Sequence, residues 1–447
     1  MLFTLLSRRT VMKKVIACIF IMLFLLTGCG DTVRPFGDDT QIADFSDGYI
    51  IENTTTDGYG LLSCDNNGNA MTSAPQAENS VQSNEKNELR GVWLSYYEIN
   101  VNSSRDTREE YSAYIRNMLA SFKPYGITDI FAHVRAYGDA IYKSEAYPTS
   151  KYAAGEQGAE LPFDLLEVIC EAAAEYGLRV HAWINPYRVH NGTDINELSA
   201  DNKARQWYNE ASNEDVAIVG GKIYFNPASY KAQQLVIEGA REILLNYPVA
   251  GIHIDDYFYP PSCGDFDSQQ YSAYLASGGT LDLDSWRRSN VNNLVAGLYS
   301  TVKSFGSDKI FSISPGGNID NNLNSLYADV RLWSRGGYAD MIIPQIYFGF
   351  DHGTHAFDRC LNEWLSLKGE GVMMPVGLGL YKSGTEDSYA GTGVNEWQSR
   401  TDILSRQVQY LRSVQSDGFV IFSCEFFDDR DTPAASELSN LKNYLNQ

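Results

Sequence analysis

The chain has 447 residues, of which 44% are hydrophobic and 13% aromatic, which is enough for a sizeable core. Its 35 basic residues against 56 acidic residues give a formal net charge of -21. This charge is opposite to that of a nucleic-acid-binding surface, and it also disfavours electrostatic attachment to anionic lipid. Seven cysteines are too few for a disulfide scaffold in a chain of this length.

The N-terminus has the pattern of a bacterial lipoprotein signal. Basic residues at 8–14 precede an apolar run at 15–26, and the tetrapeptide Leu-Thr-Gly-Cys ends at Cys29. The run is shorter than the ~20 residues of a membrane-spanning helix. We predict a signal peptide over residues 1–28 and a lipid on Cys29, which would be the protein's only attachment to the membrane and would place it outside the cytoplasm. An ordinary signal peptide is the alternative.

Residues 29–87 are rich in Asp, Asn, Ser, Thr and Gly and contain few apolar runs. Such a composition buries too little apolar surface to offset the entropy lost on ordering. We predict a flexible linker here, with a small ordered subdomain around Tyr49 and Leu61 as the alternative. The remaining residues, 88–447, form the predicted catalytic domain.

Short β-rich apolar runs alternate with helical patterns in this domain. Eight runs are predicted as strands: 91–95, 127–134, 179–185, 250–255, 310–314, 341–347, 374–380 and 418–424. Amphipathic helices are predicted at 163–176, 233–246, 407–414 and 434–445. Eight strand–helix units predict an α/β fold of the (β/α)8 TIM-barrel class, whose functional site lies at the carboxyl ends of the strands.

The fourth predicted strand ends with polar residues. Because alternate strand residues share a face, His253 and Asp255 are expected to point together into the barrel. Buried polar groups are costly unless they bind something, so Asp255 is a candidate catalytic carboxylate. Asp256 follows on the turn, either as a second carboxylate or as a helix cap, and Tyr257 comes next.

Other strand ends carry rings, amides and cations suited to binding a sugar. Alternation predicts that His133 and Arg135 share one face and that Trp183 and Asn185 share another. Sugar rings present apolar faces to aromatic residues and hydroxyls to polar ones. Core packing is the alternative for each aromatic residue. The predicted substrate-binding residues are His133, Arg135, Trp183, Asn185, Tyr187, His253, Tyr257, Gln345 and Tyr347.

Several spaced motifs resemble the glycosyl hydrolase-like 10 family, whose members are envelope barrel proteins and often lipoproteins. They are LRGVW at 89–93, HAWINPYR at 181–188, GIHIDDY at 251–257, Ser314-Pro315 and IPQIY at 343–347. The resemblance covers about 88–427 and implies a glycosidase-type barrel acting on peptidoglycan glycan strands. The 251–255 segment also resembles the fourth-strand motif of α-amylase-like retaining glycosidases. That second resemblance implies Asp255 as the nucleophile, with His253 in the place of a basic residue.

The chain departs from the α-amylase-like pattern at the fifth strand, where a Glu acid would be expected. The sequence there is SPGGNID at 314–320, without Glu. The second carboxylate therefore stays open among Asp256, Glu425, Asp320 and Glu145, and we include Asp256 and Glu425 with Asp255 as catalytic candidates.

Three hypotheses follow. The first is a glycoside hydrolase of cell-wall glycan that uses carboxylates and needs neither a cofactor nor a metal. The second is a glycan-binding lipoprotein with a degenerate barrel. The third is a metal-dependent hydrolase or deacetylase using His253, Asp255 and Asp256. The expected partners are a glycan and, through the lipid on Cys29, the membrane, without nucleic acid. The oligomeric state stays open.

Overall fold

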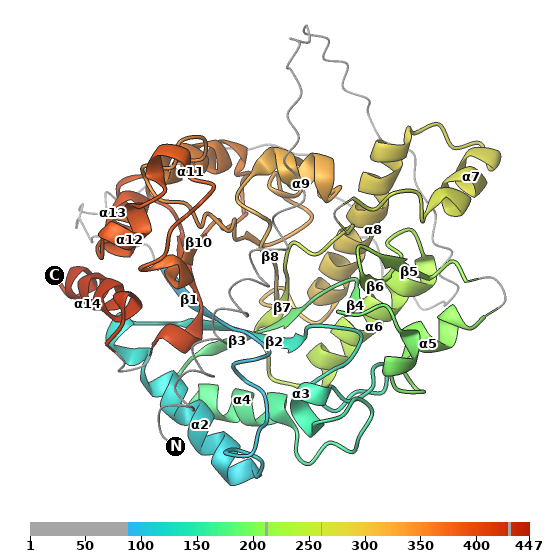
Figure 1. Ribbon diagram of the computed structural model, residues 1–447, viewed down its shortest axis with the longest axis horizontal. Helices are drawn as coiled ribbons and strands as arrows, with labels where there is room; N and C mark the ends of the chain where they lie inside the picture. Colours follow the sequence, from blue (N-terminus) through green and yellow to red (C-terminus); the bar gives the residue numbers. More distant parts are fainter. Residues whose placement is uncertain (1–87, 211–212, 261, 428–430) are drawn as a thin grey trace, which may run out of the picture. The chain divides into compact units, whose positions relative to one another are not determined.

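The computed structural model describes residues 88–447 apart from 211–212, 261 and 428–430 (Figure 1). The predicted signal peptide at 1–28, the lipidation site Cys29 and the linker at 29–87 lie outside the described residues and stay predictions. Within the described part of the chain, no helix is both long enough and apolar enough to cross a membrane.

Eight parallel strands form the central sheet, in the order β10-β11-β1-β2-β3-β7-β8-β9. Isolated parallel bridges join the two ends of this order, pairing Met341 with Met373 and Gln345 with Gly377. The sheet therefore curls into the predicted (β/α)8 barrel, which is confirmed. The strands are β1 (Leu89–Leu94), β2 (Asp129–Arg135), β3 (Arg179–Ile184), β7 (Gly251–Ile254), β8 (Ile310–Ile313), β9 (Met341–Ile342), β10 (Val376–Gly379) and β11 (Gly418–Phe422).

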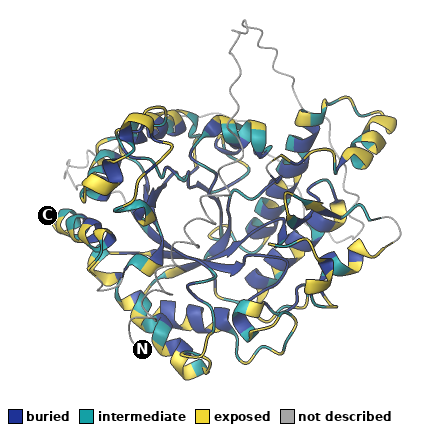
Figure 2. Ribbon diagram, viewed as in Figure 1, coloured by how far each residue is buried: buried dark blue, intermediate teal, exposed yellow. Residues whose placement is uncertain are grey.

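Helices surround the strands (Figure 1) and turn their buried faces toward them (Figure 2). Side-chain caps mark several starts: Asp164, Ser229 and Asp282 accept backbone N–H bonds at the first turns of α4, α6 and α8. The longer helices are α2 (Arg108–Ala120), α4 (Leu165–Glu175), α6 (Tyr230–Asn246), α8 (Leu283–Ser304), α11 (Phe357–Leu367), α13 (Ile403–Ser413) and α14 (Pro433–Leu445). The shorter ones are α3 (Lys151–Ala154), α5 (Lys203–Tyr208), α7 (Ser268–Ala276), α9 (Ile319–Ser325), α10 (Val330–Trp333) and α12 (Glu396–Ser399).

The core has two layers because alternate strand residues face opposite ways. The larger cluster fills the space between sheet and helices and includes Val92 and Ile130. A second cluster contains Trp93, Phe131 and Val420, on the opposite faces of β1, β2 and β11, and fills the barrel interior. Gly377 makes room for this filling, because a Cβ at that position would lie 3.0 Å from the ring of Trp93.

Two features differ from the sequence expectation. The sixth strand was expected over 341–347, but β9 spans only Met341–Ile342, since Pro344 has no N–H for the ladder and only single bridges continue at Gln345. A small antiparallel sheet was not predicted. It has the order β4-β6-β5, with β4 (Arg188–His190), β5 (Val216–Val219) and β6 (Lys222–Phe225). Its signal was the turn at Gly220 and Gly221, where φ is 59° and 75°.

Candidate active site

Asp255 lies at the carboxyl end of β7 and is only 2% exposed. Its Oδ2 accepts a hydrogen bond from Trp183 Nε1 at 2.9 Å, and its Oδ1 accepts a longer one from the backbone N of Tyr257 at 3.3 Å. Asn185 Nδ2 lies 3.4 Å from both oxygens. Burial raises the pKa of Asp255 to about 6, although these donors oppose the rise. The predicted common face of Trp183 and Asn185 is therefore observed, because both reach the same carboxylate.

His253, two residues before Asp255, lies deeper in the barrel interior. Its Nε2 accepts a hydrogen bond from Trp93 Nε1 at 3.1 Å, and because tryptophan only donates, that nitrogen carries no proton. Its Nδ1 lies 2.8 Å from Ser312 Oγ, and Ser314 Oγ lies 3.0 Å from Nε2. Burial lowers the pKa of His253 well below its usual value, so the ring is neutral. With both nitrogens engaged in the barrel interior, His253 supports the site from below.

Asp256 turns toward the opposite side of the strand end. It is more exposed than Asp255 and interacts with Gln345, and its Oδ2 would lie 3.6 Å from a Cβ at Gly316. Burial and the neighbouring charge of Asp255 raise the pKa of Asp256 to about 7. The next described helix begins at Ser268, so Asp256 caps no helix. The chain thus carries two adjacent carboxyl groups in different surroundings.

A bulge changes the expected arrangement on β2. His133 pairs with Trp183, but the register shifts so that Arg135 pairs with Ile184. The expectation that His133 and Arg135 share a face was therefore wrong, because one extra residue in a bulge reverses the alternation. His133 stacks on Trp183 with ring centroids 3.6 Å apart. Arg135 lies over the ring of Tyr147 instead, with 4.6 Å between its guanidinium carbon and the ring centroid.

Beyond β3, the motif residues Tyr187 and Arg188 are both buried. The hydroxyl of Tyr187 has no hydrogen-bond partner in the described part of the chain. Arg188 contacts two tyrosine rings, with its guanidinium carbon 4.3 Å from the centroid of Tyr137 and 4.7 Å from that of Tyr257. Sequence reasoning named Tyr187 and Tyr257 but missed Arg188, although it belongs to the same motif.

Aromatic residues also gather at the ends of β9, β10 and β11. The ring centroids of Tyr347 and Tyr381 are 5.6 Å apart, and that of Phe422 lies 6.0 Å from Tyr347. All three are at least partly exposed, so they offer ring surface at the carboxyl end of the barrel. Tyr347 was predicted, whereas Tyr381 and Phe422 were not, because neither stands in a recognisable motif.

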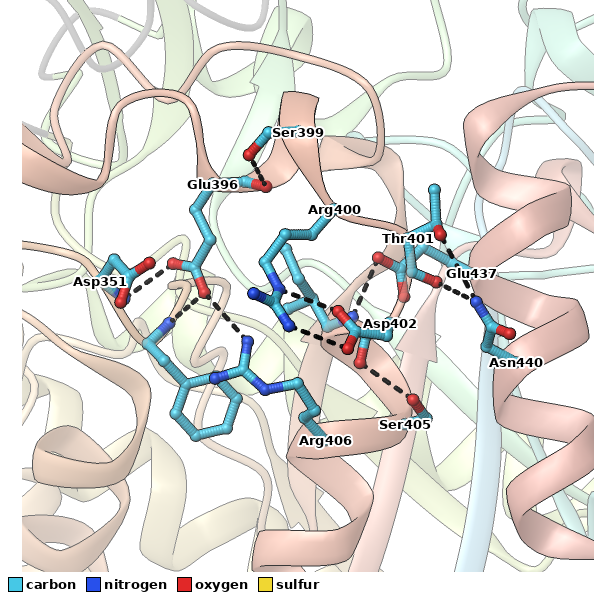
Figure 3. A network of polar contacts seen from close by, with 12 residues as sticks. Asp351, Glu396, Ser399, Arg400, Thr401, Asp402, Ser405, Arg406, Glu437 and Asn440 are labelled. Carbon is cyan, nitrogen blue, oxygen red and sulfur yellow. Dashed lines mark hydrogen bonds and ion pairs between the residues drawn. The ribbon is translucent and has the colours of Figure 1, made fainter.

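Figure 3 shows how the loop that follows β9 and carries Tyr347 is held. The buried carboxylate of Glu396 accepts hydrogen bonds from the backbone N of Phe350 at 3.0 Å and of Asp351 at 2.8 Å. Arg406 approaches the same carboxylate at 3.7 Å and covers the ring of Phe350. These contacts position the loop from α12 and α13.

Glu425 follows β11 and is exposed, on the short turn η5 (Cys424–Phe426). The buried Glu98, which sequence reasoning missed, holds this turn: it accepts bonds from Glu425 N at 3.2 Å and from Ser95 N at 2.6 Å, and one from Ser423 Oγ. Burial raises the pKa of Glu98 to about 7. Glu98 thus joins the ends of β1 and β11, and Glu425 stays a catalytic candidate.

The remaining candidates lie elsewhere. Asp320 is exposed and forms an ion pair with Arg331 at 3.2 Å. Glu145 is exposed, and its backbone N donates to Glu242 on α6. No group of three or more His, Cys, Asp or Glu side chains within the described residues is arranged to hold a metal ion. A cavity of about 410 Å³ lies beside His352, and its lining residues do not include Asp255.

Comparison with known proteins identifies the family. The model of the family described as glycosyl hydrolase-like 10 matches residues 88–388. The chain belongs to the glycosyl hydrolase-like 10 family. Glycosyl hydrolase YngK of Bacillus subtilis (strain 168) is 32% identical over 73% of this chain and 67% of the relative. Glycosyl hydrolase DigH of Escherichia coli (strain K12) is 28% identical over 70% of this chain and 79% of the relative.

Solved structures support the fold of this glycosyl hydrolase-like 10 member. The PgaB (BpsB) glycoside hydrolase domain of Bordetella bronchiseptica matches with a TM-score of 0.52 and 13% identity, over 79% of this chain and 98% of that domain. The catalytic domain of β-amylase from Paenibacillus polymyxa matches with a TM-score of 0.51 and 11% identity, over 80% of this chain and 98% of that domain. At such low identity the likeness concerns the fold alone. The family assignment and the fold together support a glycosidase.

Proposed function

We propose that the protein hydrolyses glycosidic bonds in a bacterial cell-wall glycan, the glycan strands of peptidoglycan, using Asp255 and Asp256. The observation that carries the proposal is the pair of adjacent carboxyl groups at the carboxyl end of β7. One is buried and oriented by Trp183 and Asn185, and the other is more exposed beside Gln345. Two carboxyl groups in different surroundings are what acid-and-nucleophile catalysis of glycoside hydrolysis requires.

Asp255 is the proposed nucleophile and Asp256 the proposed acid. Asp256 donates its proton to the glycosidic oxygen as the bond to the anomeric carbon breaks, while Asp255 supplies the carboxylate that attacks that carbon. The Oδ1 of Asp255 is better suited to attack, because its bond to the Tyr257 N at 3.3 Å is longer than the Trp183 bond to Oδ2 at 2.9 Å. Water then releases the sugar from Asp255, with Asp256 taking back the proton. Glu425 is the alternative acid.

The test is release of new reducing ends from purified peptidoglycan, with and without stem peptides. We expect activity in a narrow pH range. Below about pH 6 Asp255 takes up a proton and loses its nucleophilic carboxylate. Above about pH 7 Asp256 loses the proton that the leaving oxygen needs. The predicted profile of kcat/KM against pH is therefore a bell with its maximum between these values.

Asp256→Asn provides the matched variant for this profile. The substitution removes the proposed acid. The fall of kcat/KM at alkaline pH should therefore disappear, and most of the activity on natural glycan, whose leaving group needs a proton, should be lost. If the alkaline limb persists in that variant, the acid is another group, and the same measurement on Glu425→Gln decides whether it is Glu425.

A non-catalytic glycan-binding protein is the second candidate, favoured by the end of β8, where Ser314 and Gly316 stand in place of a carboxylate. Tight binding of glycan strands without new reducing ends at any pH between 4 and 9 would support this function against hydrolysis. The aromatic rings of Tyr347, Tyr381 and Phe422 suit either function.

The choice of peptidoglycan comes from the family resemblance, and the predicted lipid anchor supports it, because the anchor would hold the barrel beside the cell wall. We propose that the chain is cleaved before Cys29 and acylated there. Cells expressing the wild-type chain and supplied with labelled palmitate should carry label on the protein and retain it in the membrane fraction. Cys29→Ser should abolish both, whereas Cys64→Ser should change neither. Label retained in Cys29→Ser would contradict the anchor.

A further inference from the structure

Arg188 is a buried cation that has no charged partner within the described residues. It is 7% exposed, and its side chain forms no hydrogen bond or ion pair with any described residue. The Nε is buried and unpaired. The guanidinium contacts the rings of Tyr137 and Tyr257, which supply no hydrogen-bond acceptor oxygen to its N–H groups. Buried charges normally pair, because leaving the water solvating them is costly.

A second unpaired cation lies beside it. In the small sheet Arg188 pairs with Tyr224, and Lys222 stands two residues before Tyr224 on the same face of β6. The Nζ of Lys222 is buried and has no hydrogen-bond partner in the described chain. Burial, and then the charge of Arg188, lower the pKa of Lys222 to about 8. Two cations thus come together in a chain whose net charge is -21.

The nearby acid Asp255 does not neutralise this pair. Its oxygens already accept from Trp183, Asn185 and the Tyr257 backbone, and it forms no ion pair with Arg188 within the described residues. Arg188 nevertheless lies close to the proposed nucleophile. Its guanidinium contacts the ring of Tyr257, whose backbone N donates to Asp255, and its own backbone N donates to Asn185, which also contacts Asp255.

We propose that Arg188 and Lys222 form a subsite for the carboxylate of an acidic sugar, adjacent to the sugar attacked by Asp255. The proposal deepens the proposed function and rests on it. The N–H edge of a guanidinium fits the two oxygens of a carboxylate with parallel N–H bonds, and Lys222 adds a second, undirected charge. Tyr137 and Tyr257 fix the orientation of that edge. The carboxylate can come from the lactyl ether of muramic acid or from a hexuronic acid.

Calorimetry on the full chain tests the subsite. The ligands are N-acetylmuramic acid, its uncharged methyl ester, and glucuronic acid. We expect the wild type to bind one of the two acids about tenfold or more tightly than the ester, since charge-assisted hydrogen bonds add about 1.5–3 kcal/mol. Which acid binds identifies the source of the carboxylate. Arg188→Gln and Lys222→Gln should each reduce the preference for the acid over the ester several-fold.

Lys123→Gln is the matched control, because it removes one positive charge at an exposed position before β2, at the opposite end of the barrel. It should keep the wild-type preference. The subsite is overturned if the wild type binds neither acid more tightly than the ester, or if the preference for an acid survives in both Arg188→Gln and Lys222→Gln. Lys222→Gln keeps the test valid if Arg188→Gln fails to fold. Release of reducing ends by the wild type is measured separately, so loss of the subsite and loss of the hydrolase are distinguishable.

Discussion

Asp255→Asn is expected to reduce glycan cleavage by about a thousandfold or more, as loss of a central catalytic group does in other hydrolases. The substitution keeps the shape of the side chain and leaves an oxygen to accept the Trp183 N–H bond. It removes the charge that attacks the anomeric carbon, and it puts an NH2 group in place of the oxygen that accepts from the Tyr257 backbone N. The measurement is the rate of reducing-end release, together with the free energy of unfolding from denaturant titration.

Asp308→Asn is the control, since Asp308 is exposed before β8, at the other end of the barrel. It should leave both quantities unchanged. The stability of Asp255→Asn should stay within about 1–2 kcal/mol of the wild type, because the 2.9 Å bond from Trp183 is kept and the bond that is lost, from the Tyr257 backbone N, is the longer one at 3.3 Å. Turnover at the wild-type rate would exclude Asp255 as the nucleophile and leave the fold assignment intact.

The second large effect is on stability. Arg287→Met should lower the free energy of unfolding by about 3–5 kcal/mol, because it leaves the carboxylate of Asp267 buried without a partner. Arg287 binds Asp267 through two bonds, Nη2–Oδ1 at 2.6 Å and Nε–Oδ2 at 2.8 Å, and it also donates to the carbonyl of Gly264 at 2.6 Å. Both side chains of the pair are at most 4% exposed. Denaturant titration measures the change.

Arg108→Met serves as the comparison. Arg108 pairs with Glu167 and Glu171 at the surface, where a pair contributes about 0–1 kcal/mol. If Arg287→Met lowers the free energy of unfolding no more than Arg108→Met does, the buried pair is not a main source of stability for the segment after β7. Because that segment begins at Asp255 and Asp256, Arg287→Met should also lower activity at temperatures where the wild type is still fully folded.

The barrel and part of its site could be predicted because a strand has a period of two. That period places His253 and Asp255 on one face, and the structure agrees, since His253 bonds Trp93 within the interior and Asp255 bonds Trp183 above it. The same rule failed for Arg135, because the bulge after His133 depends on pairing with β3, which no local pattern in β2 reveals.

Contacts between segments that are distant in the sequence could not be predicted either. In the sequence Glu98 resembles an ordinary loop acid, yet it is buried against Ser423, which directly follows the last strand of the barrel. Arg188 and Lys222 lie far apart in the sequence, on β4 and β6. Only the pairing of these two strands brings them to one face of the small sheet. Which polar residues become buried depends on tertiary pairing, and their pKa shifts depend on that burial in turn.

The filled barrel interior restricts how a polymer can reach the carboxylates. Trp93, Phe131 and Val420 pack together along the axis, so a polysaccharide cannot be threaded lengthwise through the protein. A polysaccharide substrate, as proposed above, would have to approach Asp255 from outside the barrel. Whatever its length, the proposed glycan therefore has access to Asp255 only from the carboxyl end of the strands.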